Sequence, residues 1–135
     1  MDYITHKRFK QKGISGKTYN LPYGTRLRAL NGYLIFNNEP ICALTSENAH
    51  IYFSRNDDGQ GLERGRLTYA IAYANRKPNK DNSFRFTEEE RDLLYTEYPH
   101  FLIDDNEWLL FNHDFFNADV NELKELAKKL HIKIK

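Results

Sequence analysis

Residues 45–76 constrain the fold most strongly, because they contain two amphipathic segments on either side of a short polar loop. Thr45 or Ser46 is suited to cap a first helix, and apolar residues at helical spacing follow it. The polar loop at 56–61 ends that helix, and a second helix is predicted from about Leu62 onwards. The two helices therefore join a strand-rich part of the chain to a helical part.

Gly65 interrupts the second predicted helix. Inside a helix, a glycine costs roughly 1 kcal/mol relative to alanine. We therefore expect another backbone to approach the helix closely at Gly65.

Short antiparallel strands are predicted before the helices. The clearest pair is 26–30 with 33–36, because these segments flank Asn31 and Gly32, the favoured two-residue hairpin turn. A polar turn then leads into a further strand at 41–44. So few short strands are marginal alone, and we expect helices to cover one face of the sheet.

The first thirty residues add one more strand and a polar segment. Residues 3–9 predict an edge strand that places His6, Arg8 and Lys10 on one face. Residues 11–20 read as a polar loop that contains a Gly-Lys-Thr sequence. The first glycine of a phosphate-binding loop is missing there, so the sequence does not indicate a nucleotide site.

Helices dominate the prediction after residue 86. Thr87 and Glu90 form a capping box that opens a helix, and Pro99 ends it. Residues 101–116 are dense in aromatic side chains, which we expect to pack onto the core. A last amphipathic helix, capped by Asn117 or Asp119, turns one apolar face inward, formed by Val120, Leu123, Leu126, Ala127 and Leu130.

These elements predict one α+β domain spanning residues 1–135. A short N-terminal antiparallel sheet, a meander or partial barrel, packs against three or four C-terminal helices. Residues 1–45 are mainly β and basic, and residues 46–135 are mainly α and acidic toward the C-terminus. The single cysteine, Cys42, excludes an internal disulfide. No apolar run approaches the ~20 residues that span a bilayer, so we expect a cytoplasmic protein.

Charge is distributed unevenly along the chain, although the net charge is only +1. Residues 1–30 carry seven Lys or Arg and one acidic residue, whereas residues 87–135 carry six basic and twelve acidic residues. Two interpretations stay open. In the first, the basic residues 1–30 and the acidic residues 87–135 are solvated or face each other. In the second, one of these two parts attracts a charged partner.

The candidate binding residues surround the loop at 56–61 and extend to the basic N-terminus. A basic surface with nearby tyrosines suits nucleic acid, although charge pairs such as Glu63 with Arg66 offer an internal explanation. The loop does not fit a calcium site, because no glutamate occupies the last position of either EF-hand register. The candidates are Arg55, Asp57, Asp58, Arg64, Arg66, Lys7, Arg8 and Lys10.

Catalytic patterns are lacking in the sequence. The histidines show no metal-binding spacing, and His50 with Asp57 and Asp58 is only a weak candidate for a metal site. A turn in which Asp57 or Asp58 bonds to the backbone at the start of the second helix explains these residues without metal. We therefore expect a non-catalytic protein that needs no cofactor.

Two regions resemble small uncharacterised proteins encoded by phages and prophages of Gram-positive Firmicutes. The resemblance rests on residues 45–50 and 53–65, and on Trp108 with residues 112–117. It implies an accessory protein that acts inside the bacterial host cell and binds a macromolecule, as inhibitors of host defence systems do. It implies no catalytic residue.

Three functions follow, in order of preference. The first is a non-catalytic phage accessory protein that binds a bacterial or phage macromolecule, with a host or phage protein as the expected partner and no membrane. The second is nucleic-acid binding through the basic N-terminal face. The third is a metal-dependent hydrolase that uses His50, Asp57 and Asp58.

Overall fold

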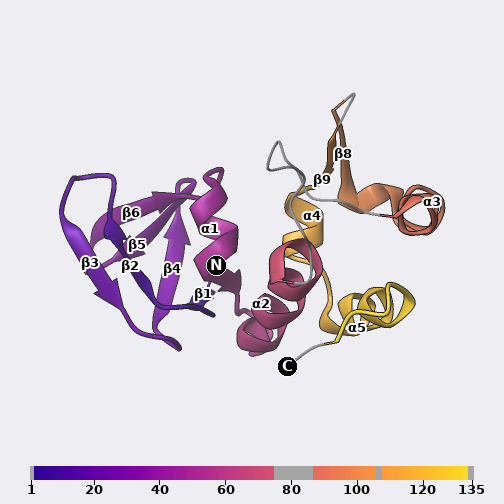
Figure 1. Cartoon of the computed structure of the whole chain (residues 1–135). Helices are drawn as coiled ribbons and strands as arrows, with labels where there is room; N and C mark the ends of the chain where they lie inside the picture. Colours follow the sequence, from indigo (N-terminus) through magenta and orange to yellow (C-terminus); the bar gives the residue numbers. More distant parts are fainter. Residues whose placement is uncertain (1, 75–86, 106–107, 134–135) are drawn as a thin grey trace. The chain divides into compact units, whose positions relative to one another are not determined.

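The computed structural model describes residues 2–74, 87–105 and 108–133. The chain folds into two compact units, Met1–Arg66 and Leu67–Lys135. Each unit has a hydrophobic core of its own, one built from residues 3–53 and the other from residues 67–130. The strands of the first unit and the helices of the second can be followed in Figure 1. The predicted α+β class is confirmed.

The N-terminal unit contains a five-stranded antiparallel sheet and a separate two-stranded hairpin. The strands are β1 (Asp2–Thr5), β2 (Phe9–Lys12), β3 (Thr18–Leu21), β4 (Arg26–Leu30), β5 (Tyr33–Phe36), β6 (Glu39–Ala43) and β7 (Phe53–Arg55). The order in the large sheet is β6-β5-β4-β1-β7, so β1 lies between β4 and β7. The prediction of an edge strand there was wrong, because the unrecognised strand β7 covers the other edge of β1.

The strands β2 and β3 form a hairpin where the sequence suggested a polar loop. The register pairs Phe9 with Leu21 and Gln11 with Tyr19, so one face of the hairpin is largely apolar. Phe9, Tyr19 and Leu21 belong to the same core as the inward residues of the large sheet. Apolar and polar residues alternate in both segments, as in a strand, but each segment has so few apolar residues that the alternation was not recognised.

Both predicted turns around β5 are present, but the second is shorter than expected because β6 begins at Glu39. Asn31 and Gly32 join β4 to β5 with φ angles of 52° and 83°, as a two-residue hairpin turn with both central residues at positive φ requires. Asn37 and Asn38 also have positive φ angles, 50° and 64°, and lead into β6. Asparagine tolerates this conformation better than most residues, which explains the pair at that turn.

Two helices follow the sheet in the sequence, as predicted. Ser46 caps α1 (Glu47–Tyr52) by accepting a hydrogen bond from the Asn48 N–H. Phe53 was expected to continue this helix but begins β7, where it pairs with Thr5. The second helix, α2 (Gly61–Tyr69), continues as a π-helical segment, η1 (Ala70–Ala74).

Gly65 on α2 is explained by a side chain and not by the backbone that we expected. A Cβ atom built on Gly65 would lie 2.2 Å from Cγ of His6, far inside van der Waals contact. His6 itself is buried and follows directly after β1. The close approach therefore packs the first turns of α2, which belong to the N-terminal unit, against the end of β1.

The C-terminal unit is mainly helical. It begins with the end of α2 and with η1, which are followed by α3 (Glu88–Glu97), η2 (Pro99–Phe101), β8 (Leu102–Asp105), β9 (Trp108–Phe111), α4 (His113–Phe116) and α5 (Val120–Lys129). The capping box predicted at Thr87 and Glu90 is confirmed, with reciprocal hydrogen bonds of 2.9 and 3.1 Å. The hairpin of β8 and β9 was not predicted.

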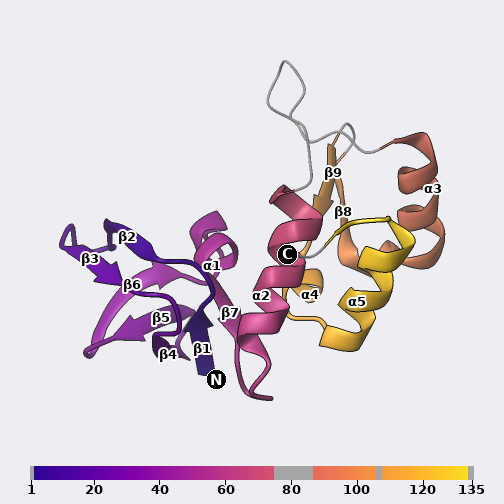
Figure 2. The ribbon, with the colours of Figure 1, turned by 60° about the horizontal axis from the view of Figure 1, so that its bottom comes forward.

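The last helix behaves as its sequence pattern indicated. Asp119 caps α5, and the five apolar residues predicted to face inward are buried. Lys129 forms an ion pair with Glu97 of α3 at 3.1 Å, and the two helices lie side by side (Figure 2). Phe101, Phe115 and Phe116 of the aromatic segment belong to the same core.

Residues 77–83, which are polar and contain Pro78 and are therefore predicted from the sequence to form a loop, lie outside the described residues. No helix in the described ranges is long and apolar enough to cross a membrane.

Candidate functional site

The loop between β7 and α2 is organised by one buried arginine. The side chain of Arg64 is 0% exposed. Its guanidinium donates a hydrogen bond of 2.6 Å to the carbonyl oxygen of Arg55 and binds both carboxylate oxygens of Asp58. Arg64 was a candidate binding residue, but the structure places it inside the N-terminal unit, where it cannot contact a partner.

The acidic residues of the loop are also engaged within the molecule. Hydrogen bonds from Arg64 lower the pKa of Asp58 to about 2, and the Gln60 N–H adds a bond of 3.0 Å to this carboxylate. Asp57 accepts a bond of 2.7 Å from the backbone N–H of Asp2. This is the capped turn that the sequence suggested, with Asp58 bound to the backbone directly before α2.

The other arginines near the loop make ion pairs of their own. Arg55 lies 3.8 Å from Asp57, measured between a guanidinium nitrogen and a carboxylate oxygen. Arg66 is exposed on α2 and pairs with Glu63, the neighbour three residues before it. The segment 55–66, which comprises the end of β7, the loop and the first turns of α2, is therefore held together by its own charges.

The basic N-terminal candidates lie on a different part of the unit. Lys7 and Arg8 are in the turn between β1 and β2. Lys10 and Lys12 point away from the core on β2, opposite Asn20 and Thr18 of β3. We call this outward surface of the hairpin, formed by Lys10, Lys12, Thr18 and Asn20, the lysine face.

The weak metal candidates do not assemble into a site. Among the described residues, no group of three or more His, Cys, Asp or Glu side chains is placed to hold a metal ion. The backbone carbonyl of His50 accepts a hydrogen bond of 3.1 Å from Nε2 of His6. Burial lowers the pKa of His6 to about 4, so this imidazole is neutral at pH 7.

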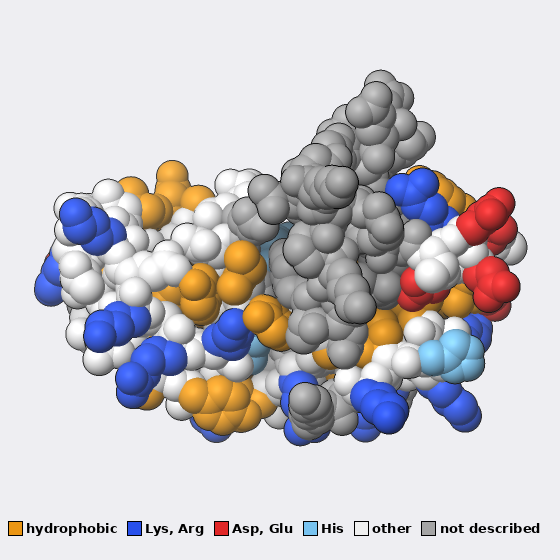
Figure 3. Space-filling view, viewed as in Figure 1, with side chains coloured by type: hydrophobic (Ala, Val, Ile, Leu, Met, Phe, Trp, Pro, Cys, Tyr) orange, Lys and Arg blue, Asp and Glu red, His pale blue; other side chains and the backbone are white. Residues whose placement is uncertain are grey.

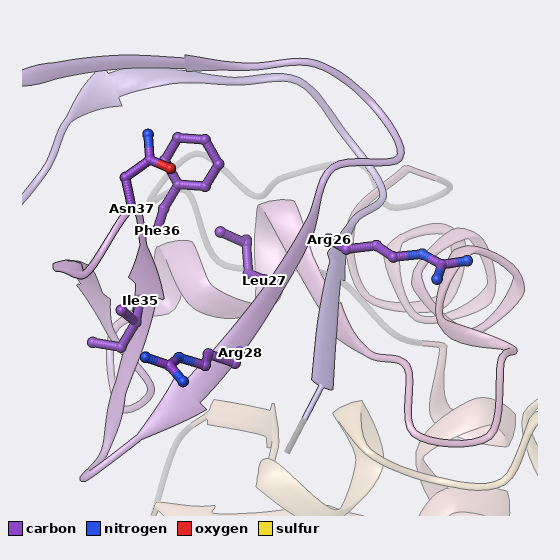
Figure 4. Close-up of a pocket in the computed structure, with 6 residues that line it drawn as sticks. All are labelled: Arg26, Leu27, Arg28, Ile35, Phe36 and Asn37. Atoms are coloured by element: carbon purple, nitrogen blue, oxygen red, sulfur yellow. The ribbon is translucent and has the colours of Figure 1, made fainter.

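A pocket that we did not predict lies at the open end of the β4 and β5 pair (Figure 4). The last residues in register are Arg28 and Ile35, and beyond them the two strands diverge toward the Asn37 turn. The opening is shallow and has a volume of about 330 Å³. We call it the arginine pocket; its lining residues are Arg26, Leu27, Arg28, Ile35, Phe36 and Asn37.

The floor of the arginine pocket is apolar and its rim is cationic. Leu27 is buried, and Phe36 is half-buried with an edge-to-face contact to Tyr19. Arg26 and Arg28 are exposed on the outward side of β4. In Figure 4 the Arg28 side chain extends toward Ile35, while Arg26 extends away from the other five side chains.

Neither arginine of the pocket is neutralised by a described residue. Within residues 2–74, 87–105 and 108–133, the side chains of Arg26 and Arg28 form no ion pair and no hydrogen bond. Asp2 is the cross-strand neighbour of Arg28, yet it is the backbone N–H of Asp2 that is engaged, with Asp57. This pair of arginines therefore differs from Arg64, whose charge is fully matched.

The outward surface of the two strands continues past the pocket with exposed apolar side chains. Leu30 is 51% exposed and Tyr33 is 41% exposed, and they stand opposite each other beside the hairpin turn. On the face drawn in Figure 3, Lys and Arg are scattered over both units, whereas Asp and Glu gather over α3. The surface of β4 and β5 is thus mixed apolar and cationic.

A signal for the pocket was present in the sequence. The segment 26–30 alternates Arg-Leu-Arg-Ala-Leu, which places both arginines on one face and Leu27 on the other. What the sequence could not show is the point at which β4 and β5 separate.

Comparison with family models, with curated proteins and with solved structures finds no match for this chain.

Proposed function

We propose that this chain is a non-catalytic binding protein that captures a bacterial or phage macromolecule through the arginine pocket. The observation that supports the proposal is the pocket itself, where an apolar floor is bordered by two arginines that form no ion pair with any residue the structure describes. Arginine and aromatic side chains around a partly apolar centre are the composition of energetically important interface residues.

The phage setting implied by the resemblance gives this binding activity a role. A phage accessory protein acts by engaging a component of the host or of the phage. Inhibition of a host defence system is one such role, because blocking a partner requires binding and no chemistry. The partner that we propose is a host or phage protein.

A tagged pull-down from a Gram-positive cell lysate tests the proposal, run with and without nuclease. The protein is compared with the double variant Arg26→Glu/Arg28→Glu. A matched control, Lys10→Glu/Lys12→Glu, changes the net charge equally on the lysine face. We expect a protein that resists nuclease to be captured by the parent and by the control, and to be lost with the pocket variant.

The outcome that overturns the proposal is capture that the pocket variant retains in full. A thermal melt of each variant shows whether loss of capture reflects unfolding. If the double variant melts early, Arg28→Gln provides a milder change at the same position.

Nucleic-acid binding is the second candidate, and the lysine face favours it. Lys10 and Lys12 lie on one exposed face, and no described acidic side chain forms an ion pair with them. Lysines placed in this way contact phosphates without reading sequence. Capture that disappears with nuclease and with Lys10→Glu/Lys12→Glu, and falls steeply with salt, would establish this alternative.

A further inference from the structure

The arginine pocket has the size and chemistry to take one apolar side chain of a partner. Its volume of about 330 Å³ is at the lower end of ligand pockets, which suits a side chain better than a cofactor. Leu27, Ile35 and Phe36 supply an apolar floor, so the inserted part of an aliphatic or aromatic group would be partly removed from water.

The two arginines define what must lie beside that side chain. Arg26 and Arg28 flank Leu27 in the sequence, and both stand on the outward side of β4. The two side chains extend in opposite directions from β4, Arg28 toward Ile35 and Arg26 away from the other lining residues (Figure 4). An anionic group on only one side of the inserted residue would therefore reach only one arginine.

We infer that the pocket recognises a protein segment in which one apolar residue is flanked by acidic residues on both sides. This inference rests on the proposed binding function and names the chemistry of the partner. The flanking carboxylates pair with Arg26 and Arg28, and arginine is suited to this because its guanidinium binds a carboxylate through two parallel hydrogen bonds.

Charge and composition favour an acidic protein segment over nucleic acid at this pocket. Single-stranded nucleic acid needs exposed aromatic rings on which bases stack. Among the residues that line the pocket, the aromatic side chain is Phe36, which is half-buried; the exposed Tyr23 and Tyr33 are not part of the lining. The lysines that would follow a phosphate backbone lie on the lysine face, on the other side of the shared core.

The test uses the whole 135-residue chain and two pools of random probes. A display library of random peptides and a pool of random single-stranded oligonucleotides are each selected for binding. Retained sequences are then measured against the parent, Arg26→Glu/Arg28→Glu and the control Lys10→Glu/Lys12→Glu. We expect the selected peptides to share the pattern acidic, apolar, acidic. Their affinity for the pocket variant should be lower than for the parent by about tenfold or more.

Two further variants separate the apolar from the ionic requirement. Ile35→Ser should weaken the binding of the selected peptides while leaving the salt dependence of that binding unchanged. Arg28→Lys, which keeps the charge but loses the paired hydrogen bonds, should bind less tightly than the parent and more tightly than Arg28→Gln.

Several outcomes overturn the inference. Selected peptides that lack flanking acids, an absence of enriched peptides, or equal binding by the pocket variant would each do so. Oligonucleotides that bind through Arg26 and Arg28 would overturn it too, yet would leave the proposed capture of a macromolecule standing. If the pull-down also showed no dependence on the pocket, both the proposed binding function and the inferred partner segment would be wrong.

Discussion

The segment 55–66 and the arginine pocket are both rich in arginine, but the buried arginine of the segment is paired within the fold, whereas the arginines of the pocket are exposed. Arg64 is fully buried and donates hydrogen bonds to Asp58 and to the Arg55 carbonyl within the N-terminal unit. Arg26 and Arg28 are exposed and pair with no described residue. The charge of the loop therefore stabilises the fold, and the charge of the pocket stays available for a partner.

This difference depends on the element that carries each arginine. Arg64 follows a loop whose carboxylates and carbonyls converge on the first turns of α2, so its charge is satisfied locally. Arg26 and Arg28 occupy alternate positions of a strand, where neighbours on the same face belong to other strands. A basic residue beside acidic residues in sequence is thus a weaker binding candidate than one on an alternating strand.

The largest effect should come from removing the buried arginine. Arg64→Ala leaves Asp58 and the Arg55 carbonyl without their partner, and we expect a loss of about 3–5 kcal/mol in the free energy of unfolding. Urea unfolding measures it, with Arg66→Ala as the control. That surface change should cost less than about 0.5 kcal/mol. Equal stability of the two variants would contradict the contrast between buried and exposed arginines.

The buried imidazole of His6 should make stability depend on pH. Burial lowers its pKa to about 4, helped by the charge of Lys7 and opposed by the bond to the His50 carbonyl. Between about pH 6.5 and 4 the unfolded chain binds a proton that the folded chain does not, so stability falls as pH falls. Its full contribution is roughly 3 kcal/mol.

Urea unfolding across this pH range measures the contribution of His6. The dependence should shrink in His6→Gln, which removes the titrating group, and persist in His113→Gln, whose side chain is exposed. A His6→Gln variant with the parent's full pH dependence would show that other groups are responsible.

A substitution at Gly65 should have an intermediate effect. Gly65→Ala gains helix propensity but drives a Cβ atom into His6, and overpacking of this kind costs about 1–3 kcal/mol. The same substitution combined with His6→Ala should recover part of the loss. Calorimetric melts of the single and double variants measure this coupling, and strictly additive changes would argue against the contact.

The smallest stability effect should come from the arginine pocket. Arg26→Glu/Arg28→Glu removes no ion pair between described residues, so we expect a change within about 0.5 kcal/mol per substitution in urea unfolding. The same variant is the one expected to lose its partner. A large loss of stability would mean that these arginines support the fold, as Arg64 does.

Local patterns in the sequence predicted the elements that depend on nearby residues. The Asn31-Gly32 turn, the Ser46 cap, the capping box at Thr87 and the inward face of α5 are confirmed. Each of these requires only residues within a few positions of one another. The short strand β7 was harder to predict, because its partner β1 is distant in the sequence.

The candidate site was predicted only in part, for a related physical reason. Charge and hydrogen-bonding capacity marked Arg64 and Asp58 as important, but the sequence could not show that they bind each other inside the fold. The arginines of β4 were visible as a pattern, yet their significance depends on where β5 diverges. Burial and strand separation are properties of the assembled unit.

The contact between His6 and Gly65 also carries an expectation about sequence variation. A large side chain at position 6 leaves no room for a Cβ atom at position 65, so relatives of this chain should change the two positions together. A small residue at position 6 would permit alanine at position 65. If glycine is invariant at position 65, the reason would then be the close packing of α2 against the end of β1, and not a role in activity.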